Sequence, residues 1–217
     1  MRGFVLAIAL AVPFAASSAQ ADPDISAAGG GSLPAGWSMR LDSPTADPKG
    51  VRFATMPPGW HVTTGPATIL YRATDAVRGD YVVNAVLHQT KAPMHPEAYG
   101  VFLGGADLDK PTQSYLYFLV RGDGRYMVKH RQGADLHPIV EWTEHPAVAK
   151  QDAAGAASNA LTVRVDTDSV RLLVNAKPVR AFPRTIMREV NGIAGVRINH
   201  NLDVHIGSFD VVPATKR

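Results

Sequence analysis

Short stretches in which apolar and polar residues alternate follow one another along most of this chain. In 161–165, 170–174 and 202–206 every second residue is apolar. Successive side chains of a strand point to opposite faces, so a period of two is typical of a strand with one buried face. These patterns and β-rich runs predict strands over 81–90, 99–103, 114–122, 125–132, 161–165, 170–174, 194–198 and 202–211.

Turn signals separate these runs. Asp123-Gly124 stands between 114–122 and 125–132, where a type I′ hairpin turn accommodates residues that tolerate a positive φ. Thr167-Asp168 is predicted to be the turn between 161–165 and 170–174. In the last run the apolar phase slips by one residue between Ile206 and Phe209. We therefore expect a β-bulge at Gly207 or Ser208.

The order of the elements indicates the fold class. No strand–helix–strand alternation is present, and only the alanine-rich segment 146–157 is a candidate for a helical turn. Many short strands joined by Gly, Pro and Asp turns are typical of a β-sandwich or barrel. We predict an all-β domain over residues 37–212, with under about 10% helix and a short C-terminal tail, 213–217.

The first residues are typical of a targeting segment. Arg2 precedes an apolar run of 13 residues, 4–16, and Ala19-Gln20-Ala21 has the small residues of a signal-peptide cleavage site. A run of that length is too short to span about 30 Å of hydrocarbon. We expect a cleaved signal peptide, 1–21, followed by a flexible tether, 22–36, and a periplasmic or secreted protein.

The net charge and the absence of cysteine exclude several classes of function. With 22 Lys and Arg against 19 Asp and Glu the net charge is +3, and loss of Arg2 with the signal leaves 21 against 19, or +2. This is too little for an electrostatic nucleic-acid or polybasic membrane binder. Because there is no cysteine, disulfides, thiolate metal sites and cysteine nucleophiles are excluded.

Several stretches of the chain carry motifs that are found together in one known group. They are Trp60-His61-Val62 with Gly79-Asp80-Tyr81, the run 99–105, the hairpin 114–126, Trp142, the hairpin 159–177, and the closing strands 193–196 and 204–211. Together they resemble the concanavalin A-like and laminin G-like jelly-roll domains. Within that group the motifs are most similar to secreted 3-keto-disaccharide-hydrolase-like domains, distant relatives of family 16 glycosidases. The resemblance covers about residues 37–212 and implies an antiparallel two-sheet jelly-roll β-sandwich.

One departure from the pattern lies in the hairpin 159–177. Ala176 stands where the group usually has the glycine of an Asn-Gly-Lys turn. Asn tolerates the left-handed region better than other non-glycine residues. We therefore expect Asn175 to carry any left-handed conformation at this turn.

The catalytic pattern of the related glucanases is absent. A retaining glucanase of this fold carries E-x-D-x-E on one strand, which places its carboxylates on one face. The nearest run here is Glu141-Trp142-Thr143-Glu144, whose spacing puts the two carboxylates on opposite faces of a strand. We interpret it as a solvated loop and assign no catalytic residue.

The sequence motifs for a metal site and for a catalytic nucleophile are also weak or absent. Asp107 and Asp109 are interpreted as turn residues, although a rim calcium site is the alternative. The eight histidines lack the spacing of a zinc motif, and His95, His137 and His145 each precede a proline. We interpret them as scattered surface residues. No G-x-S-x-G elbow supports a serine nucleophile. No metal and no other cofactor is expected.

A set of polar and aromatic side chains forms the candidate ligand site. Strand parity places these residues opposite the apolar ones in their strands, which we interpret as outward on one sheet. Aromatic rings and fork-shaped donors on such a face suit a sugar. The alternative is an ordinary polar outer face. The predicted ligand-binding residues are Asn84, His88, Tyr115, Tyr117, Lys129 and Arg131.

Three functions follow as hypotheses. The first is an exported protein that binds carbohydrate or a cell-envelope glycan without catalysis. The second is a glycoside hydrolase or lyase that acts on a modified disaccharide, as the resemblance implies. The third is a protein–protein interaction module that uses the same sheet. We expect a monomer with no nucleic-acid partner and no membrane span.

Overall fold

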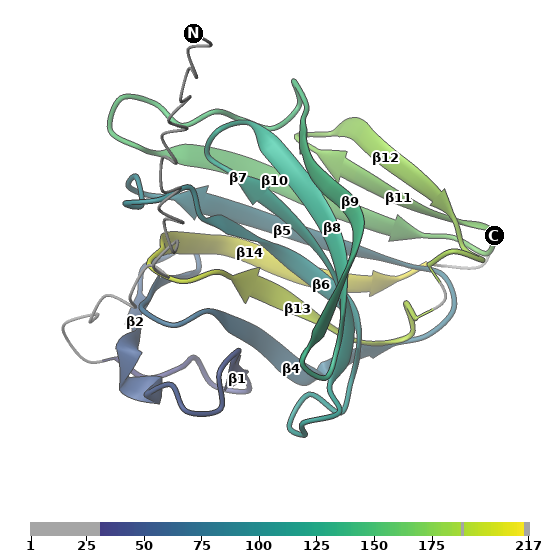
Figure 1. The fold of residues 1–217 in the computed structure, drawn as a ribbon, viewed down its shortest axis with the longest axis horizontal. Coiled ribbons are helices and arrows are strands. Elements are labelled where there is room, and N and C mark those ends of the chain that lie inside the picture. The colour runs from purple at the N-terminus through teal and green to yellow at the C-terminus, as the bar shows by residue number, and fades with distance from the viewer. Residues whose placement is uncertain (1–30, 188, 215–217) are drawn as a thin grey trace, which may run out of the picture.

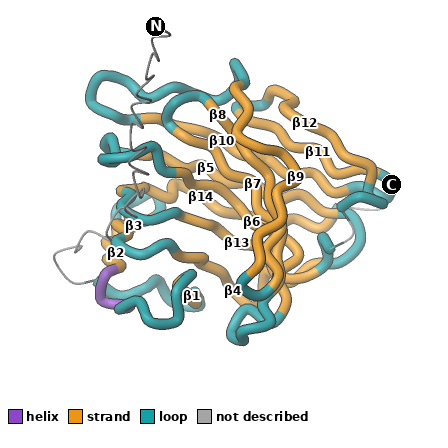
Figure 2. The backbone as a smooth tube through the Cα atoms, in the orientation of Figure 1, coloured by secondary structure: helices purple, strands orange, loops and turns teal. Residues whose placement is uncertain are grey.

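The computed structural model describes residues 31–187 and 189–214, and nearly all of its regular structure is β (Figures 1 and 2). Two antiparallel seven-stranded sheets contain every strand of that part of the chain. Its only helical element is a three-residue 3₁₀ turn, η1 (Pro48–Gly50), drawn in purple in Figure 2. The predicted fold class, an antiparallel two-sheet jelly-roll β-sandwich, is confirmed.

The two sheets are defined by their strand order. Sheet A runs β1 (Ser38–Leu41), β4 (Thr68–Val77), β13 (Gly192–Ile198), β6 (Ala98–Ala106), β7 (Ser114–Arg121), β8 (Arg125–Gln132) and β9 (Asp135–Glu144). Sheet B runs β12 (Lys177–Pro183), β11 (Ser169–Val174), β10 (Ala157–Val165), β5 (Tyr81–Gln89), β14 (Asp203–Pro213), β3 (Trp60–Thr64) and β2 (Val51–Thr55).

The main core lies between the two sheets. Among the alternating apolar residues of the sequence, Leu87, Val163, Phe118 and Val196 are at most 1% exposed there. Each such side chain contributes about 1.5–3 kcal/mol when it leaves water. The predicted strand faces are therefore correct.

Sheet A is also buried on its other face. A second apolar cluster, the outer-face cluster, covers the side of sheet A that points away from sheet B. Leu108, in the loop between β6 and β7, belongs to it although it is not in a strand. The members of the outer-face cluster are Ile69, Ala98, Phe102, Leu108, Tyr115, Tyr117, Leu119 and Met127.

The predicted irregularities are partly confirmed. The register of β14 against β5 shifts between Ile206 and Ser208, which is the expected bulge. Segment 146–157 contains turns and the start of β10, and no helix. The turn at Thr167-Asp168 is as predicted, because the Asp166 amide donates to the Ser169 carbonyl at 2.8 Å.

The β7–β8 turn differs from the predicted type I′ turn. Arg121 pairs with Arg125, so the loop has three residues, and of these Gly124 has a positive φ of 83°. A three-residue hairpin loop commonly ends in such a left-handed residue. The Asp-Gly pair marks the hairpin correctly but not its length.

The β11–β12 turn is strained at an alanine. Val174 pairs with Lys177, which leaves a two-residue loop, and both Asn175 (φ 50°) and Ala176 (φ 62°) are left-handed. The expectation that Asn175 alone would carry this conformation is wrong, because a two-residue hairpin loop of this type needs a positive φ at both positions. The Asn175 amide is fixed by bonds to the Ala147 carbonyl and the Ala160 amide.

The four edge strands are short or interrupted. On sheet A the edges are β1, with four residues, and β9, which contains Pro138. On sheet B they are β2, with five residues, and β12, which contains Pro178 and Pro183.

The predicted signal peptide, residues 1–21, lies outside the described residues, as does most of the predicted tether, 22–36. Within the described part of that tether, Leu33 packs against the core between the sheets. The described residues contain no helix that is long and apolar enough to cross a membrane.

Replacement of Ala176 by glycine should stabilise the protein. An L-residue in the left-handed region costs about 1–2 kcal/mol, part of which the extra freedom of glycine in the unfolded chain cancels. We expect Ala176→Gly to raise the free energy of unfolding by about 0.5–1 kcal/mol, measured by urea unfolding. Ala160→Gly, within β10, serves as the control and should lower it. A destabilised Ala176→Gly would contradict this account of the turn.

Candidate functional site

The six predicted ligand residues do not share one sheet. Tyr115 and Tyr117 lie on β7 in sheet A, whereas Asn84 and His88 lie on β5 in sheet B. Lys129 and Arg131 lie on β8, beside the tyrosines. The prediction of a single face is wrong, because strand parity gives the face of each strand but not the sheet to which the strand belongs.

The tyrosine part of the prediction is half correct. Tyr117 pairs with Lys129 and Tyr115 with Arg131 across the hairpin, as expected, and both tyrosines point away from the core between the sheets. However, Tyr115 is 0% and Tyr117 only 3% exposed. They are packed in the outer-face cluster, so neither ring is an open platform for a ligand.

A buried arginine organises this face of sheet A. The Arg197 side chain, 6% exposed, forms a two-pronged ion pair with Asp42, at 2.7 Å to Oδ1 and 2.6 Å to Oδ2. It also donates to the Tyr115 hydroxyl at 3.0 Å, and its guanidinium lies 4.8 Å from the centre of the Tyr117 ring. Arg131 contacts the same Asp42 carboxylate at 3.1 Å. Two cations therefore share one anion.

This pairing fixes the charge of Asp42. Burial alone would raise the pKa of the Asp42 carboxyl, but the charges and hydrogen bonds of Arg197 and Arg131 together hold it below its ordinary value. Asp42 is therefore a carboxylate at neutral pH. It can accept hydrogen bonds but cannot donate a proton.

A pocket of about 420 Å³ opens beside this pair, where β1, β4, β6 and β13 begin or end. The size suits a small molecule. We call it the rim pocket. Its lining residues are Asp42, Ser43, Pro66, Ala67, Glu97, Arg197, Asn199 and His200.

A second polar group also lines the rim pocket. Glu97 Oε1 lies 2.6 Å from His200 Nε2, and Glu97 Oε2 accepts from the Asn199 amide at 3.1 Å. Two buried atoms of the lining residues, Arg197 Nε and Asn199 Oδ1, have no hydrogen-bond partner. One is a donor and the other an acceptor. A buried polar atom without a partner costs about 1–3 kcal/mol. Because neither atom is accessible to solvent, a ligand in the rim pocket would bond to other groups of its polar lining.

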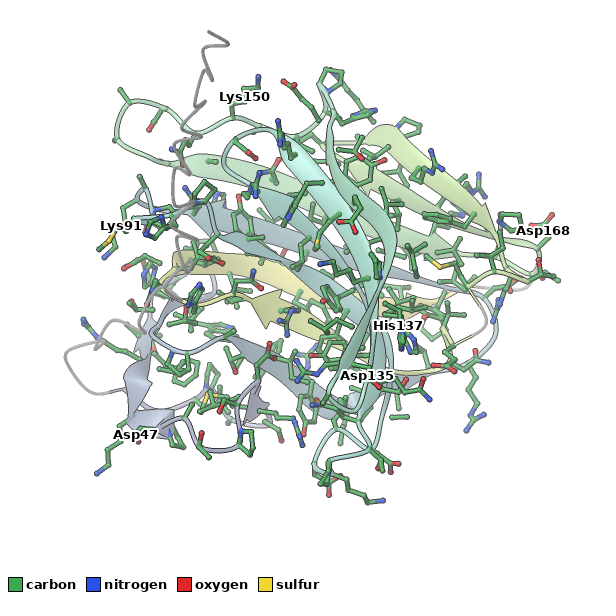
Figure 3. All side chains as sticks on the ribbon, in the orientation of Figure 1. Asp47, Lys91, Asp135, His137, Lys150 and Asp168 are labelled. Atoms are coloured by element: carbon green, nitrogen blue, oxygen red, sulfur yellow. The ribbon has the colours of Figure 1, made fainter. Side chains whose placement is uncertain are left out.

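Histidines gather on the outer face of sheet B. His61, His205 and His88 stand in register on the adjacent strands β3, β14 and β5, with ring centres 6.4 and 5.7 Å apart. His61 Nε2 bonds the Asp203 carboxylate, which Lys91 (labelled in Figure 3) also contacts at 2.8 Å. Burial, and then the neighbouring His205, lower the pKa of His88.

A second histidine pair lies in sheet A. The rings of His130 and His137 are stacked with centres 6.0 Å apart, and His137 is labelled in Figure 3. Together with His61, His205 and His88, this pair brings five of the eight histidines into two clusters. The prediction of scattered histidines is therefore wrong. Among the residues that the structure describes, no three His, Asp or Glu side chains stand where they can hold one metal ion.

Ser114, His130 and Glu189 meet, but not as a catalytic triad. His130 Nε2 lies 2.9 Å from Ser114 Oγ and 2.7 Å from Glu189 Oε2, and Ser114 Oγ donates to that same carboxylate oxygen at 2.9 Å. In a triad the acid binds the ring nitrogen that the serine does not use. Here serine and acid share one nitrogen, so the acid does not orient the imidazole toward the serine.

Two of the remaining acidic candidates, Asp107 and Glu144, are bound to local partners. Asp107 accepts from Lys110 Nζ at 2.8 Å and from Thr112 at 3.1 Å, and it occupies a left-handed turn position (φ 49°). Glu144 is paired at 2.7 Å with Lys150, also labelled in Figure 3. These contacts agree with the interpretation of Asp107 as a turn residue.

The comparisons with known proteins point to one fold. No family model and no curated protein matches the sequence. Among solved structures, a protein of unknown function with a galectin-like fold from Bacillus subtilis is similar at 13% identity, with a TM-score of 0.60 over 83% of this chain and 90% of that chain. The carbohydrate binding module CBM66 from Bacillus subtilis has 9% identity and a TM-score of 0.57, over 82% and 95% of the two chains.

An enzyme has the same architecture. The glycoside hydrolase family 16 endo-glucanase from Bacteroides ovatus, in complex with G4G3G-2F-DNP, has 6% identity and a TM-score of 0.56, over 81% of this chain and 94% of that chain. The fold is concanavalin A-like. Identities this low show the fold alone, and they leave the function of this concanavalin A-like sandwich to its own residues.

Polar residues between the predicted strands could have indicated the rim pocket. Alternation within the strands does not report on such residues. Asn199-His200 interrupts the alternation between two apolar strands, and Glu97 follows Pro96 just before β6. Polar residues at adjacent strand ends can meet at one rim of a sandwich. Which ends meet depends on strand order, so Asp42 and Arg197, 155 residues apart, could not be paired from the sequence.

Truncation of Tyr117 should destabilise the protein. Truncation of a solvent-exposed tyrosine would leave the stability nearly unchanged. Removal of a buried aromatic side chain costs about 3–5 kcal/mol. We expect Tyr117→Ala to lose about 3 kcal/mol of unfolding free energy, and Tyr117→Phe, which keeps the ring over Arg197, to lose under about 1 kcal/mol. Urea unfolding of both variants measures this. A stable Tyr117→Ala would show that the ring is not part of the packing.

His88 should make the stability of the protein depend on pH. The lowered pKa of His88 means that the unfolded chain takes up this proton at about pH 6.5, before the folded chain does. The contribution of neutral His88 to the free energy of unfolding is therefore present above about pH 6.5. It is lost as the pH falls toward about 5. We expect His88→Gln to flatten the curve of unfolding free energy between pH 7.5 and 5. His137→Gln is the control, and parallel curves for His88→Gln and the unmodified protein would contradict the prediction.

Proposed function

We propose that this protein is an exported carbohydrate-binding protein without catalytic activity, and that the rim pocket holds the sugar. The observation that carries the proposal is the polar lining of the rim pocket, which combines the Asp42–Arg197 pair with Glu97 and its partners Asn199 and His200. A sugar hydroxyl both donates and accepts, so a polyhydroxyl ligand can bond to the carboxylates and to the nitrogen donors of this lining. The similar structures include a carbohydrate binding module and a glucanase, which adds support at the level of the fold.

The charges of the rim pocket favour a neutral ligand. Asp42 is neutralised by Arg197 and Arg131, and Glu97 is held by His200 and Asn199. An anion would meet both carboxylates, and a cation would meet the guanidinium. Hydroxyl groups can bond to either without adding charge.

The state of the Asp42 carboxylate supports binding over hydrolysis. A glycosidase needs a general acid that keeps its proton near neutral pH, which requires a raised pKa. The pKa of Asp42 is lowered, and both Asp42 oxygens are taken by arginine. Asp42 therefore cannot serve as that acid.

Export rests on the sequence of residues 1–21. The signal-like segment and the absence of cysteine fit a periplasmic or secreted protein. An envelope or extracellular glycan is then the partner that the protein would encounter.

A glycan array with the mature protein tests the function. Binding to neutral oligosaccharides should appear and should weaken at least about tenfold in Ser43→Phe, since a ring there covers the mouth of the pocket. Ser43 is exposed, so the melting temperature should not change. Ser38→Phe, also exposed but outside the pocket lining, is the control. The same mixtures assayed for newly formed sugar ends should show no cleavage.

Two results would contradict this proposal. Equal affinity in Ser43→Phe would place the sugar elsewhere. Cleavage of any bound glycan would favour the hydrolase or lyase hypothesis.

A further inference from the structure

A pocket lined by arginines lies at one edge of sheet B. It has a volume of about 380 Å³, and its lining residues come from β10, β11 and β12, which lie side by side in the sheet (Figure 1). Three arginines and four apolar residues line it, and none of them lines the rim pocket. We call it the arginine pocket. Its arginines are Arg164, Arg171 and Arg180.

Strand register places two of these arginines opposite each other. Arg164 on β10 pairs with Arg171 on β11, and the next residues, Val165 and Val170, pair with each other in the core. Because successive side chains of a strand alternate between its faces, both arginines point to the outer face of sheet B. Their side chains are 54% and 52% exposed. A ligand in the arginine pocket can therefore reach both guanidinium groups.

One carboxylate lies between these two cations. Asp166 accepts a hydrogen bond from Nε of Arg164 at 3.2 Å and others from Nε and Nη2 of Arg171. Burial alone would raise the pKa of the Asp166 carboxyl, but the hydrogen bonds and charges of the two arginines hold it below its ordinary value. Asp166 is thus one negative charge that two arginines share.

The pairing leaves positive charge and donors on the pocket wall. Asp168, labelled in Figure 3, adds a second negative charge near Arg171, but no Asp or Glu lines the pocket itself. Like charges directly opposite each other on adjacent strands destabilise a sheet. A guanidinium has five N–H donors. The bonds to Asp166 do not use either Nη group of Arg164 or the Nη1 group of Arg171.

The rest of the lining is apolar. Leu173 is two residues from Arg171 and lies half-buried on the same face of β11. The register of β11 against β12 shifts between Leu172 and Leu173, which leaves Val179 as an extra residue on β12. Such a bulge bends its strand and redirects side chains, and it coincides with the pocket. The apolar lining residues are Leu173, Pro178, Val179 and Ala181.

This combination selects one class of ligand. Arginine side chains bind carboxylates through two parallel hydrogen bonds. A metal ion or an amine would be repelled by the arginines, and a neutral sugar would not use their charge. A small inorganic anion would leave the apolar lining uncovered. A carboxylate attached to an apolar body matches both parts of the lining.

We propose that the arginine pocket binds an organic carboxylate with an apolar body, whose carboxylate contacts Arg164 and Arg171 and whose body covers Leu173. A free acid fits better than an acidic lipid in a membrane, because membrane-binding clusters commonly have about four to eight Lys and Arg residues and three line this pocket. The site is separate from the rim pocket and does not rest on the proposed function.

Isothermal titration with three probes tests the ligand class. Octanoate has a carboxylate and an apolar chain, acetate has the carboxylate with almost no chain, and octanol has the chain without the charge. We expect octanoate to bind at least about tenfold more tightly than either, since two buried CH₂ groups or one hydrogen bond to a charged group each correspond to about tenfold in affinity.

Two variants place the carboxylate at the arginines. Arg164→Gln should weaken octanoate binding about tenfold, and Arg164→Lys, which keeps the charge without the fork, should recover part of that loss. Arg125→Gln is the matched control, because Arg125 is 46% exposed and also lies beside an aspartate, but on β8 of sheet A. It should bind octanoate as the unmodified protein does.

A third variant places the chain on the apolar lining. Leu173→Thr removes apolar surface and keeps a β-branched residue that suits a strand. It should weaken octanoate binding and leave acetate binding unchanged. The melting temperature of each variant, measured without ligand, checks that the fold is retained.

Three results would overturn the proposal. Equal affinity for octanoate and octanol would show that the carboxylate is not recognised. An equal loss of octanoate binding in Arg125→Gln would show a general attraction to positive charge. Binding to phosphatidylglycerol vesicles without binding to octanoate would show that the arginines meet a membrane surface and not a free acid. The glycan array tests the rim pocket separately, so either proposal can fail alone.

Discussion

The ion pair between Arg197 and Asp42 is the constraint around which sheet A is arranged. A guanidinium that is only 6% exposed is tolerated when its charge is paired. Asp42 supplies the counter-charge from the end of β1, Tyr115 supplies an acceptor from β7, and Arg131 shares the carboxylate from β8. Strands that are distant in sequence are thereby fixed to one another on the side of the sheet that has no partner sheet.

The same pair explains why a polar pocket can exist beside an apolar layer. The outer-face cluster buries one side of sheet A, and the ion pair marks where that layer ends and the rim pocket begins. Asp42 with its two arginines and Glu97 bring charges of both signs to the pocket, so neither sign dominates it. Its selectivity then comes from the directions of hydrogen bonds, which suits ligands that differ only in their hydroxyl groups.

Much of the fold could be predicted from the sequence, and most of the site could not. Strands such as β5, β10 and β11 have one face in the core, so their alternating apolar and polar residues reveal them in the sequence. β9 has no such signal, because most of its residues are exposed on both faces. Tyr115 and Tyr117 were assigned to the correct face of β7, but the sequence does not show that the other face of sheet A is covered too. The rim pocket joins Asp42, Glu97 and Arg197, whose meeting is decided by strand order alone.

The proline residues at the sheet edges have a consequence for the behaviour of the protein at high concentration. An unpaired edge strand is a template on which another chain can add a strand. Proline has no amide hydrogen to donate, so Pro138 in β9 and Pro178 and Pro183 in β12 break the row of donors that such an addition requires. The other two edges, β1 and β2, are only four and five residues long. The described part of the chain thus presents no long continuous strand edge to other copies, which disfavours fibrous aggregation.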